Sequence, residues 1–162
     1  MDTQKDREEK ATELLHRGYQ AQRQGDVADA IRFYQESIQL YPTAEAHTSL
    51  GWTYSFLQRY EEAIEECRHA IAINPEFGNP YNDIGLYLMK MGKPDDAVPW
   101  LEHAIEAIHY DTPHYPHLNL GRIALAKGDL LQASREFGLA LEIEPRSQTA
   151  HHTLAALSAQ LN

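Results

Sequence analysis

Residues 18–42 read GYQAQRQGDVADAIRFYQESIQLYP, and residues 50–75 read LGWTYSFLQRYEEAIEECRHAIAINP. Both stretches contain a glycine, an alanine 12 positions after it, and a small residue seven positions after the alanine. The chain shows this spacing four times, in three columns: Gly18, Gly51, Gly85 and Gly121; Ala30, Ala63, Ala97 and Ala133; and Ser37, Ala70, Ala104 and Ala140. Because the same pattern recurs along the chain, it determines the fold expected for the whole chain and not for one segment alone.

The distance between one unit and the next varies, at 14, 15 and 17 residues from the last small residue to the next glycine. Insertions at this place indicate a loop between units. Apolar residues recur at helical spacing on both sides of a turn, so each unit is predicted to be a pair of helices. The turns contain Gly25, Gly92 or Gly128. Most second helices are expected to end before a proline, at Pro42, Pro75 and Pro145.

Glycine inside a helix is about 1 kcal/mol less favourable than alanine, so four glycines at matching positions require a packing reason. We expect each glycine to face the alanine of the second helix, which lets the two helices approach closely. Larger side chains are expected to fill the space beside the crossing, among them Tyr34, Leu101 and Phe137. A single hairpin cannot bury its apolar face alone, whereas four stacked hairpins share a continuous core.

These residues resemble the tetratricopeptide repeat, a helix–turn–helix unit of about 34 residues with small residues, an aromatic and a closing proline. The resemblance implies an all-α, right-handed superhelical α-solenoid of such repeats, in a single domain over residues 1–162. Cys67 replaces the usual aromatic of the second repeat, and His109 replaces a proline. The repeats are expected at about residues 11–43, 44–77, 78–113 and 114–146, with a capping helix over 147–161 that carries Ala150, Leu154, Leu157 and Leu161 on one face.

In this family the first helices of successive repeats line a concave surface, and the resemblance implies a groove there that binds a peptide. Aromatic side chains would give rigid contact area, and amides and arginine would bond the main chain or a carboxylate of the peptide. The alternative for the aromatics is that they complete the packing between repeats. The expected groove residues are Tyr19, Arg23, Trp52, Phe56, Asn79, Asn82, Asp83, Leu86, Met89, Asn119 and Arg122.

Charge and composition narrow the class of partner. The formal net charge of -10 argues against nucleic acid and anionic membranes, since binding to phosphates needs a basic face. The sequence has no apolar run of 18 residues and begins with a strongly charged stretch, residues 1–10. We therefore expect a cytoplasmic protein that binds another protein, with no nucleic acid and no membrane as partner.

No pattern in the sequence predicts catalysis or a cofactor. There is no glycine-rich phosphate loop, nucleophile elbow or metalloprotease signature, and the single cysteine, Cys67, falls in a column expected to be buried. Histidines cluster in the stretch HYDTPHYPH, residues 109–117. Convergence of three or four of its side chains would make a metal site; the alternative, which we expect, is a loop that bridges two repeats. We expect that the protein is not an enzyme and that it binds no cofactor and no metal ion.

Two hypotheses for function follow. The first is a protein-interaction module or scaffold that holds a peptide or helix of a partner in its concave groove. The second is a self-associating assembly subunit or secretion-type chaperone, with a homodimer formed through Phe33, Trp100 or the terminal helix. Phe33 and Trp100 occupy equivalent places where the other repeats carry Glu66 and Glu136. Exposure of the two aromatics would favour the second hypothesis, and burial against the neighbouring hairpin would remove that argument.

Overall fold

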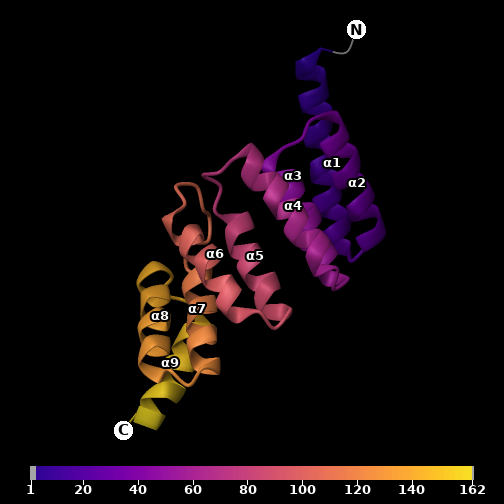
Figure 1. The fold of residues 1–162 in the computed structure, drawn as a ribbon. Helices are drawn as coiled ribbons and strands as arrows, with labels where there is room; N and C mark the ends of the chain where they lie inside the picture. The colour runs from indigo at the N-terminus through magenta and orange to yellow at the C-terminus, as the bar shows by residue number, and fades with distance from the viewer. Residues whose placement is uncertain (1–2, 162) are drawn as a thin grey trace.

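The protein is described over residues 3–161 by a computed structural model. These residues form helices and no strand, apart from one isolated bridge between Phe77 and His109. Figure 1 shows the helix pairs following one another from the N-terminus to the C-terminus, which lie at opposite ends of the molecule. The helices are α1 (Gln4–Gln24), α2 (Val27–Leu40), α3 (Ala44–Phe56), α4 (Tyr60–Ile73), α5 (Asn79–Lys90), α6 (Pro94–Glu106), α7 (Tyr115–Ala126), α8 (Leu130–Ile143) and α9 (Gln148–Leu161).

Polar side chains begin several of these helices by accepting hydrogen bonds from free backbone N–H groups. Asp26 accepts from the N–H of Asp29 at the start of α2, and Asp129 accepts from the N–H of Gln132 at the start of α8. Helices α2 and α8 therefore begin directly after these two aspartates. Helix α1 begins with a capping box at Thr3, well before the expected start of the first repeat at residue 11.

The turns inside the hairpins use a left-handed residue seven positions after each helical glycine. Gly25, Gly92 and Gly128 adopt φ values of 80°, 74° and 76°, which glycine accepts without the steric cost of a Cβ atom. The second hairpin has Gln58 at this place, with φ of 58°. Gln58 therefore carries backbone strain that the other three turns avoid.

The helical glycines face large side chains, which corrects the expectation that they face the alanines. A Cβ atom on Gly121 would lie 2.8 Å from the Phe137 ring, and one on Gly85 would lie 2.5 Å from Leu101. Gly51 keeps part of the expected contact, since its Cβ would lie 2.8 Å from the carbonyl oxygen of Ala63. The glycine column therefore makes room for the residue one turn beyond the alanine, and the alanine packs beside it.

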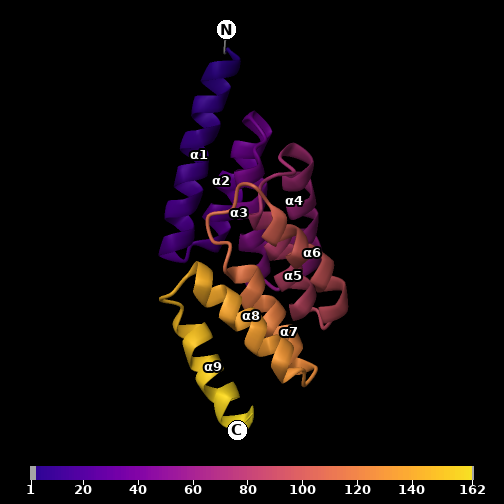
Figure 2. The ribbon, with the colours of Figure 1, turned by 90° about the vertical axis from the view of Figure 1, so that its left-hand side faces the viewer.

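Each hairpin packs against the next, so the molecule is an all-α solenoid. Within hairpins α1 packs on α2, α3 on α4, α5 on α6 and α7 on α8; between hairpins α2 contacts α3, α4 contacts α5, and α6 contacts α7. The first helices also meet one another, α3 against α5 and α5 against α7. Figure 2 shows the same succession from the side, with α1 and α9 at the two ends. Helices α3, α5 and α7 therefore form one continuous face.

Helix α9 covers the open side of the last hairpin, as a capping helix should. Ala150 and Leu157 are buried in the core cluster of α7 and α8, and Leu154 packs against it. The side chain of Leu161 lies outside the described residues. No helix within residues 3–161 combines the length and apolarity that crossing a bilayer requires.

Phe33 is buried, with only 7% of its surface exposed. The guanidinium groups of Arg17 and Arg32 lie over its ring, at 4.2 and 4.3 Å from the centroid. Trp100 is half-buried, and its ring centroid lies 6.2 Å from that of Tyr81. The alternative of an exposed aromatic pair on the convex side is therefore wrong for Phe33, which removes it as a dimer contact.

Candidate functional site

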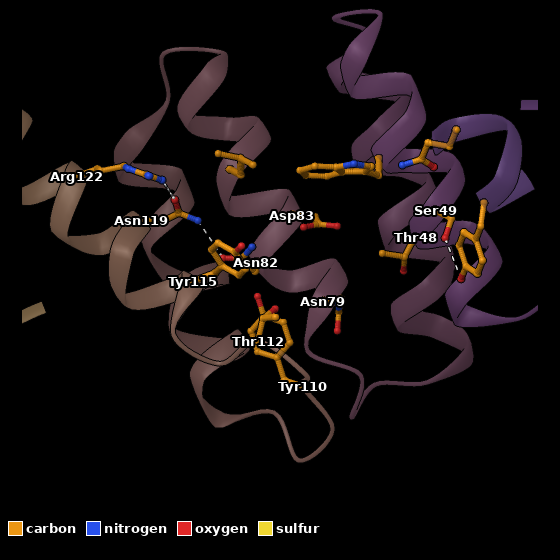
Figure 3. A pocket seen from close by; sticks show the side chains of 14 residues that line it. Thr48, Ser49, Asn79, Asn82, Asp83, Tyr110, Thr112, Tyr115, Asn119 and Arg122 are labelled. Atoms are coloured by element: carbon orange, nitrogen blue, oxygen red, sulfur yellow. Dashed lines mark hydrogen bonds between the residues drawn. The ribbon is translucent and has the colours of Figure 1, made fainter. Parts of the chain in front are cut away.

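The concave face holds a cavity of about 410 Å³ that is built mainly by α3, α5 and α7. Asn79, Asp83 and Leu86 of α5 point to it together because they lie one turn apart on one side of the helix. Figure 3 shows the Asp83 side chain between the α7 residues on one side and Thr48 and Ser49 on the other. The lining residues are Tyr19, Gln22, Thr48, Ser49, Trp52, Asn79, Asn82, Asp83, Leu86, Tyr110, Thr112, Tyr115, Asn119 and Arg122.

A chain of hydrogen bonds runs along one side of the cavity. Arg122 donates from Nη1 to Oδ1 of Asn119 at 2.9 Å, and Asn119 donates from Nδ2 to Oδ1 of Asn82 at 3.0 Å. Asn82 and Asn119 are buried, whereas Arg122 is exposed. The chain fixes the orientation of two amides and holds a guanidinium at the rim, where it can meet a carboxylate or a peptide carbonyl.

Asp83 is the acidic centre of the cavity. Burial raises the pKa of its carboxyl from 3.8 to about 7, while the neighbouring Asn82 amide lowers the pKa in part. Among the described residues, no lysine, arginine or histidine nitrogen lies within ion-pair distance of this carboxylate. The ionised form of Asp83 is therefore poorly compensated inside the protein.

Two polar atoms of α5 are buried without a hydrogen-bond partner within residues 3–161. They are Oδ1 of Asn79, which lines the cavity, and the hydroxyl of Tyr87. Burial raises the pKa of the Tyr87 hydroxyl far above its usual range. A buried acceptor without a partner costs about 1–3 kcal/mol, so a donor supplied by a ligand at Asn79 would be favoured.

Aromatic side chains form the other walls of the cavity. Tyr19 is 38% exposed, and its ring contacts that of Tyr34 edge to face at 5.9 Å between centroids. Trp52 is half-buried and meets Phe56 edge to face at 5.7 Å. Tyr19 and Trp52 therefore pack against neighbouring side chains and also line the cavity, while their contact with a peptide stays a prediction.

The loop between α6 and α7 closes one end of the cavity, which the sequence did not predict. The backbone carbonyl of His109 accepts a hydrogen bond from the N–H of Gly78 at 2.8 Å, and the backbone N–H of His109 donates to the carbonyl of Glu76 at 3.1 Å. This pairing carries Tyr110 and Thr112 into the lining, as Figure 3 shows. Tyr110 packs directly on Gly78, and burial raises the pKa of its hydroxyl.

The structure brings eight of the expected groove residues to the cavity: Tyr19, Trp52, Asn79, Asn82, Asp83, Leu86, Asn119 and Arg122. Three others lie elsewhere. Met89 packs against the core of the third hairpin, and Phe56 lines a separate hollow with Lys90. Arg23 is exposed and outside the lining. The role of all eleven residues in binding stays a prediction.

The histidines of residues 109–117 do not converge within the described chain. Nε2 of His109 lies 3.6 Å from Oε2 of Glu76, whereas Nδ1 of His117 lies 2.8 Å from Oε2 of Glu136 on α8. Cys67 is fully buried, and burial raises the pKa of its thiol well above 9.0. Thiolate chemistry is therefore disfavoured at Cys67.

Comparison with known proteins agrees with this architecture. A family model described as tetratricopeptide repeat matches residues 10–76, and a second model of the same description matches residues 81–108. The small glutamine-rich tetratricopeptide repeat-containing protein 2 of Saccharomyces cerevisiae is 31% identical over 90 residues, which are 55% of this chain and 26% of that protein. Its counterpart in Mycosarcoma maydis is 29% identical over 60% of this chain and 28% of that protein. The chain thus spans about a quarter of these relatives.

Solved structures show the same fold at low identity. Pseudomonas aeruginosa pilF superposes with a TM-score of 0.88 at 21% identity, over 95% of this chain and 70% of that chain. YrrB, described as a TPR protein with an unusual peptide-binding site, superposes with a TM-score of 0.66 at 22% identity, over 91% of this chain and 75% of that chain.

Proposed function

The chain belongs to the tetratricopeptide repeat family, and we propose that it binds an extended segment of a partner protein in the cavity of its concave face. The observation that carries this proposal is the uncompensated Asp83 carboxylate beside the amide chain of Asn82 and Asn119. Proteins of this family serve as protein-interaction modules, and the likeness to YrrB, described by its peptide-binding site, supports the same type of ligand here.

An extended segment suits the polar groups of the cavity. Arg122 on α7 has free donors, and the buried acceptor of Asn79 on α5 becomes reachable when its side chain rotates, so a peptide main chain across α5 and α7 would meet both. A main chain offers a carbonyl and an N–H at each residue. A partner segment would therefore supply hydrogen-bond partners to polar groups that have none within the protein.

The segment should carry a basic side chain at Asp83. A lysine or arginine supplies the missing positive charge, and the ring of Trp52 beside it adds a cation–π contact. A cation stabilises the ionised carboxylate, so binding lowers the raised pKa of Asp83. Affinity should therefore rise as the pH increases toward about 7 and level off above it.

The acidic centre also argues for a protein over nucleic acid or an anionic membrane as the partner, because phosphate groups would be repelled by Asp83. A cytoplasmic location stays a prediction. Self-association remains the alternative, without the buried Phe33 as its contact.

A phage-displayed library of random linear peptides tests the proposal. We expect the wild-type protein to select sequences with a recurrent lysine or arginine, and Asp83→Asn to lose that preference. Asp96→Asn provides the matched control, since it removes an exposed carboxylate on α6, away from the cavity. Selection of the same basic sequences by Asp83→Asn would contradict the role of Asp83, and failure to select any recurrent sequence would contradict peptide binding.

A further inference from the structure

Three potential metal ligands converge on the second hairpin, outside the peptide cavity. His47 of α3 and His69 of α4 both direct Nδ1 to Oε2 of Glu66, at 2.6 and 3.9 Å. The three ligand atoms lie within 4.8 Å of one another. None of these residues lines the cavity of the concave face, so the cluster needs an explanation of its own.

The fourth hairpin provides an internal comparison. His117 and Glu136 stand 70 positions after His47 and Glu66 and form the same pair, with 2.8 Å between Nδ1 and Oε2. The residue 70 positions after His69 is Leu139. A histidine–glutamate pair therefore serves packing in one repeat without a third ligand, and only the second hairpin adds one.

The glutamates of the two pairs also differ in their other contacts. Oε1 of Glu136 accepts a hydrogen bond from Gln132 at 2.7 Å, so each of its oxygens has a partner. In the second hairpin the position that corresponds to Gln132 is Glu62, which pairs with Arg59 and not with Glu66. The groups near the Glu66 carboxylate are the imidazoles of His47 and His69, and both approach its Oε2.

A carboxylate lies near the second ring nitrogen of His69, at a separation longer than a hydrogen bond. While Nδ1 faces Glu66, its Nε2 lies 3.7 Å from Oε1 of Glu65. In metal sites, a carboxylate that accepts a hydrogen bond from the second nitrogen of a ligating histidine orients the ring, and Glu65 is placed to do so when the ring turns. His69 is half-exposed at the helix surface, with 52% of its side chain accessible, so its ring can turn toward an ion.

We propose that His47, Glu66 and His69 bind a divalent transition-metal ion of the zinc type. Bonds of about 2.0–2.2 Å in a tetrahedral site place neighbouring ligand atoms roughly 3.3 Å apart, and the two observed separations of 2.6 and 3.9 Å lie on either side of that value. Two imidazoles and a carboxylate match the preference of Zn²⁺ for nitrogen and oxygen ligands. The fourth position is left for water.

Titration of the metal-free, untagged protein with Zn²⁺, followed by calorimetry, tests this site. We expect one ion per chain in the wild type. His69→Leu places in the second hairpin the residue that the fourth hairpin has naturally, and it should weaken binding by more than the about 10- to 100-fold typical of losing an outer partner. Absorption of bound Co²⁺ reports whether the coordination is tetrahedral.

His103→Leu is the matched control, because His103 stands at the equivalent position of the third hairpin, is exposed and has Tyr81 and Trp100 in place of the pair. It should bind the ion as the wild type does. Circular dichroism of the metal-free variants checks that each is folded. A wild type without stoichiometric binding, or equal binding by His69→Leu, overturns the proposal.

Discussion

Asn119 of α7 donates a hydrogen bond of 3.0 Å to Asn82 of α5, across the boundary between the third and fourth hairpins. Both amides are buried and both line the cavity of the concave face. The contact therefore joins two repeats and shapes the site at once. Substitutions of these amides should change stability as well as binding.

Removal of this amide pair is the first prediction. Asn119→Ala leaves the Asn82 carbonyl oxygen without its donor, and a buried group without a partner costs about 1–3 kcal/mol. Unfolding in urea should show a loss of that size. Ser49→Ala, which removes a weak surface contact of 3.4 Å, should stay within about 0.5 kcal/mol. Equal stability of Asn119→Ala and the wild type would contradict the role of the contact.

The glycine column gives a second prediction. Gly121→Ala places a Cβ atom 2.8 Å from the Phe137 ring and should destabilise the protein by about 1–3 kcal/mol. Gly138→Ala, in the same hairpin, meets no atom within 4 Å and should stabilise α8 by up to about 1 kcal/mol. Thermal melts of the two variants therefore shift in opposite directions. Shifts of the same sign would contradict the packing described for Gly121.

The strained turn of the second hairpin gives a third prediction. Gln58 has φ of 58° where the other turns have glycine. Gln58→Gly relieves the strain but adds freedom to the unfolded chain, and we expect a net gain of about 0.5–1 kcal/mol. Gln58→Val should lose stability, since a β-branched residue is disfavoured at positive φ. Both changes are read by urea unfolding, and a more stable valine variant would refute the assignment of strain.

The raised pKa of Asp83 gives a fourth prediction, on the pH dependence of stability. Between pH 4 and 7 the unfolded chain has lost this proton while the folded protein still holds it, so Asp83 makes the folded state less stable as the pH rises. Asp83→Asn removes this dependence. We expect its advantage over the wild type to grow from pH 5 to about 7 and then level off, reaching about 1–2 kcal/mol because Asp83 is partly exposed and solvent screens its charge. A constant difference across this range would contradict the raised pKa of the Asp83 carboxyl.

The repeat architecture was predictable because small residues recur at fixed spacing, and packing constraints act in the same way on every hairpin. The spacing did not reveal which side chain each glycine faces. That depends on the rotation of the two helices about their axes, and the structure places Phe137, not Ala133, against Gly121. Sequence columns thus indicate close contact but leave its partner open.

The cavity was predictable only where it is built from the first helices. Asn82, Asp83 and Asn119 were expected because the resemblance to the tetratricopeptide repeat implies that the first helices line the concave surface, and they line the cavity from α5 and α7. Tyr110 and Thr112 come from an insertion without periodicity, and their place depends on backbone pairing between residues 76–78 and 109. Gly78 was a signal for that contact, because a residue with a Cβ atom would collide with Tyr110.

The pairing of His47 with Glu66 was not predicted from the sequence, although His117 and Glu136 have the same separation of 19 residues and form the same pair. Glu66 and Glu136 occupy places equivalent to those of Phe33 and Trp100. The histidine–glutamate pairs of the second and fourth hairpins correspond to Leu14 with Phe33 in the first hairpin and to Tyr81 with Trp100 in the third, so the two kinds of pair alternate along the chain. The third ligand, His69, becomes evident only when the two helices are placed together.

The most direct test of peptide binding in the cavity is a nuclear magnetic resonance titration of the ¹⁵N-labelled protein with a basic peptide selected from the library. The account predicts that the amide signals of Asn82, Asp83 and Asn119 shift with a common affinity, and that Asp83→Asn weakens that affinity. Shifts confined to the second helices, α2, α4 and α6, with the cavity residues unchanged, would contradict it.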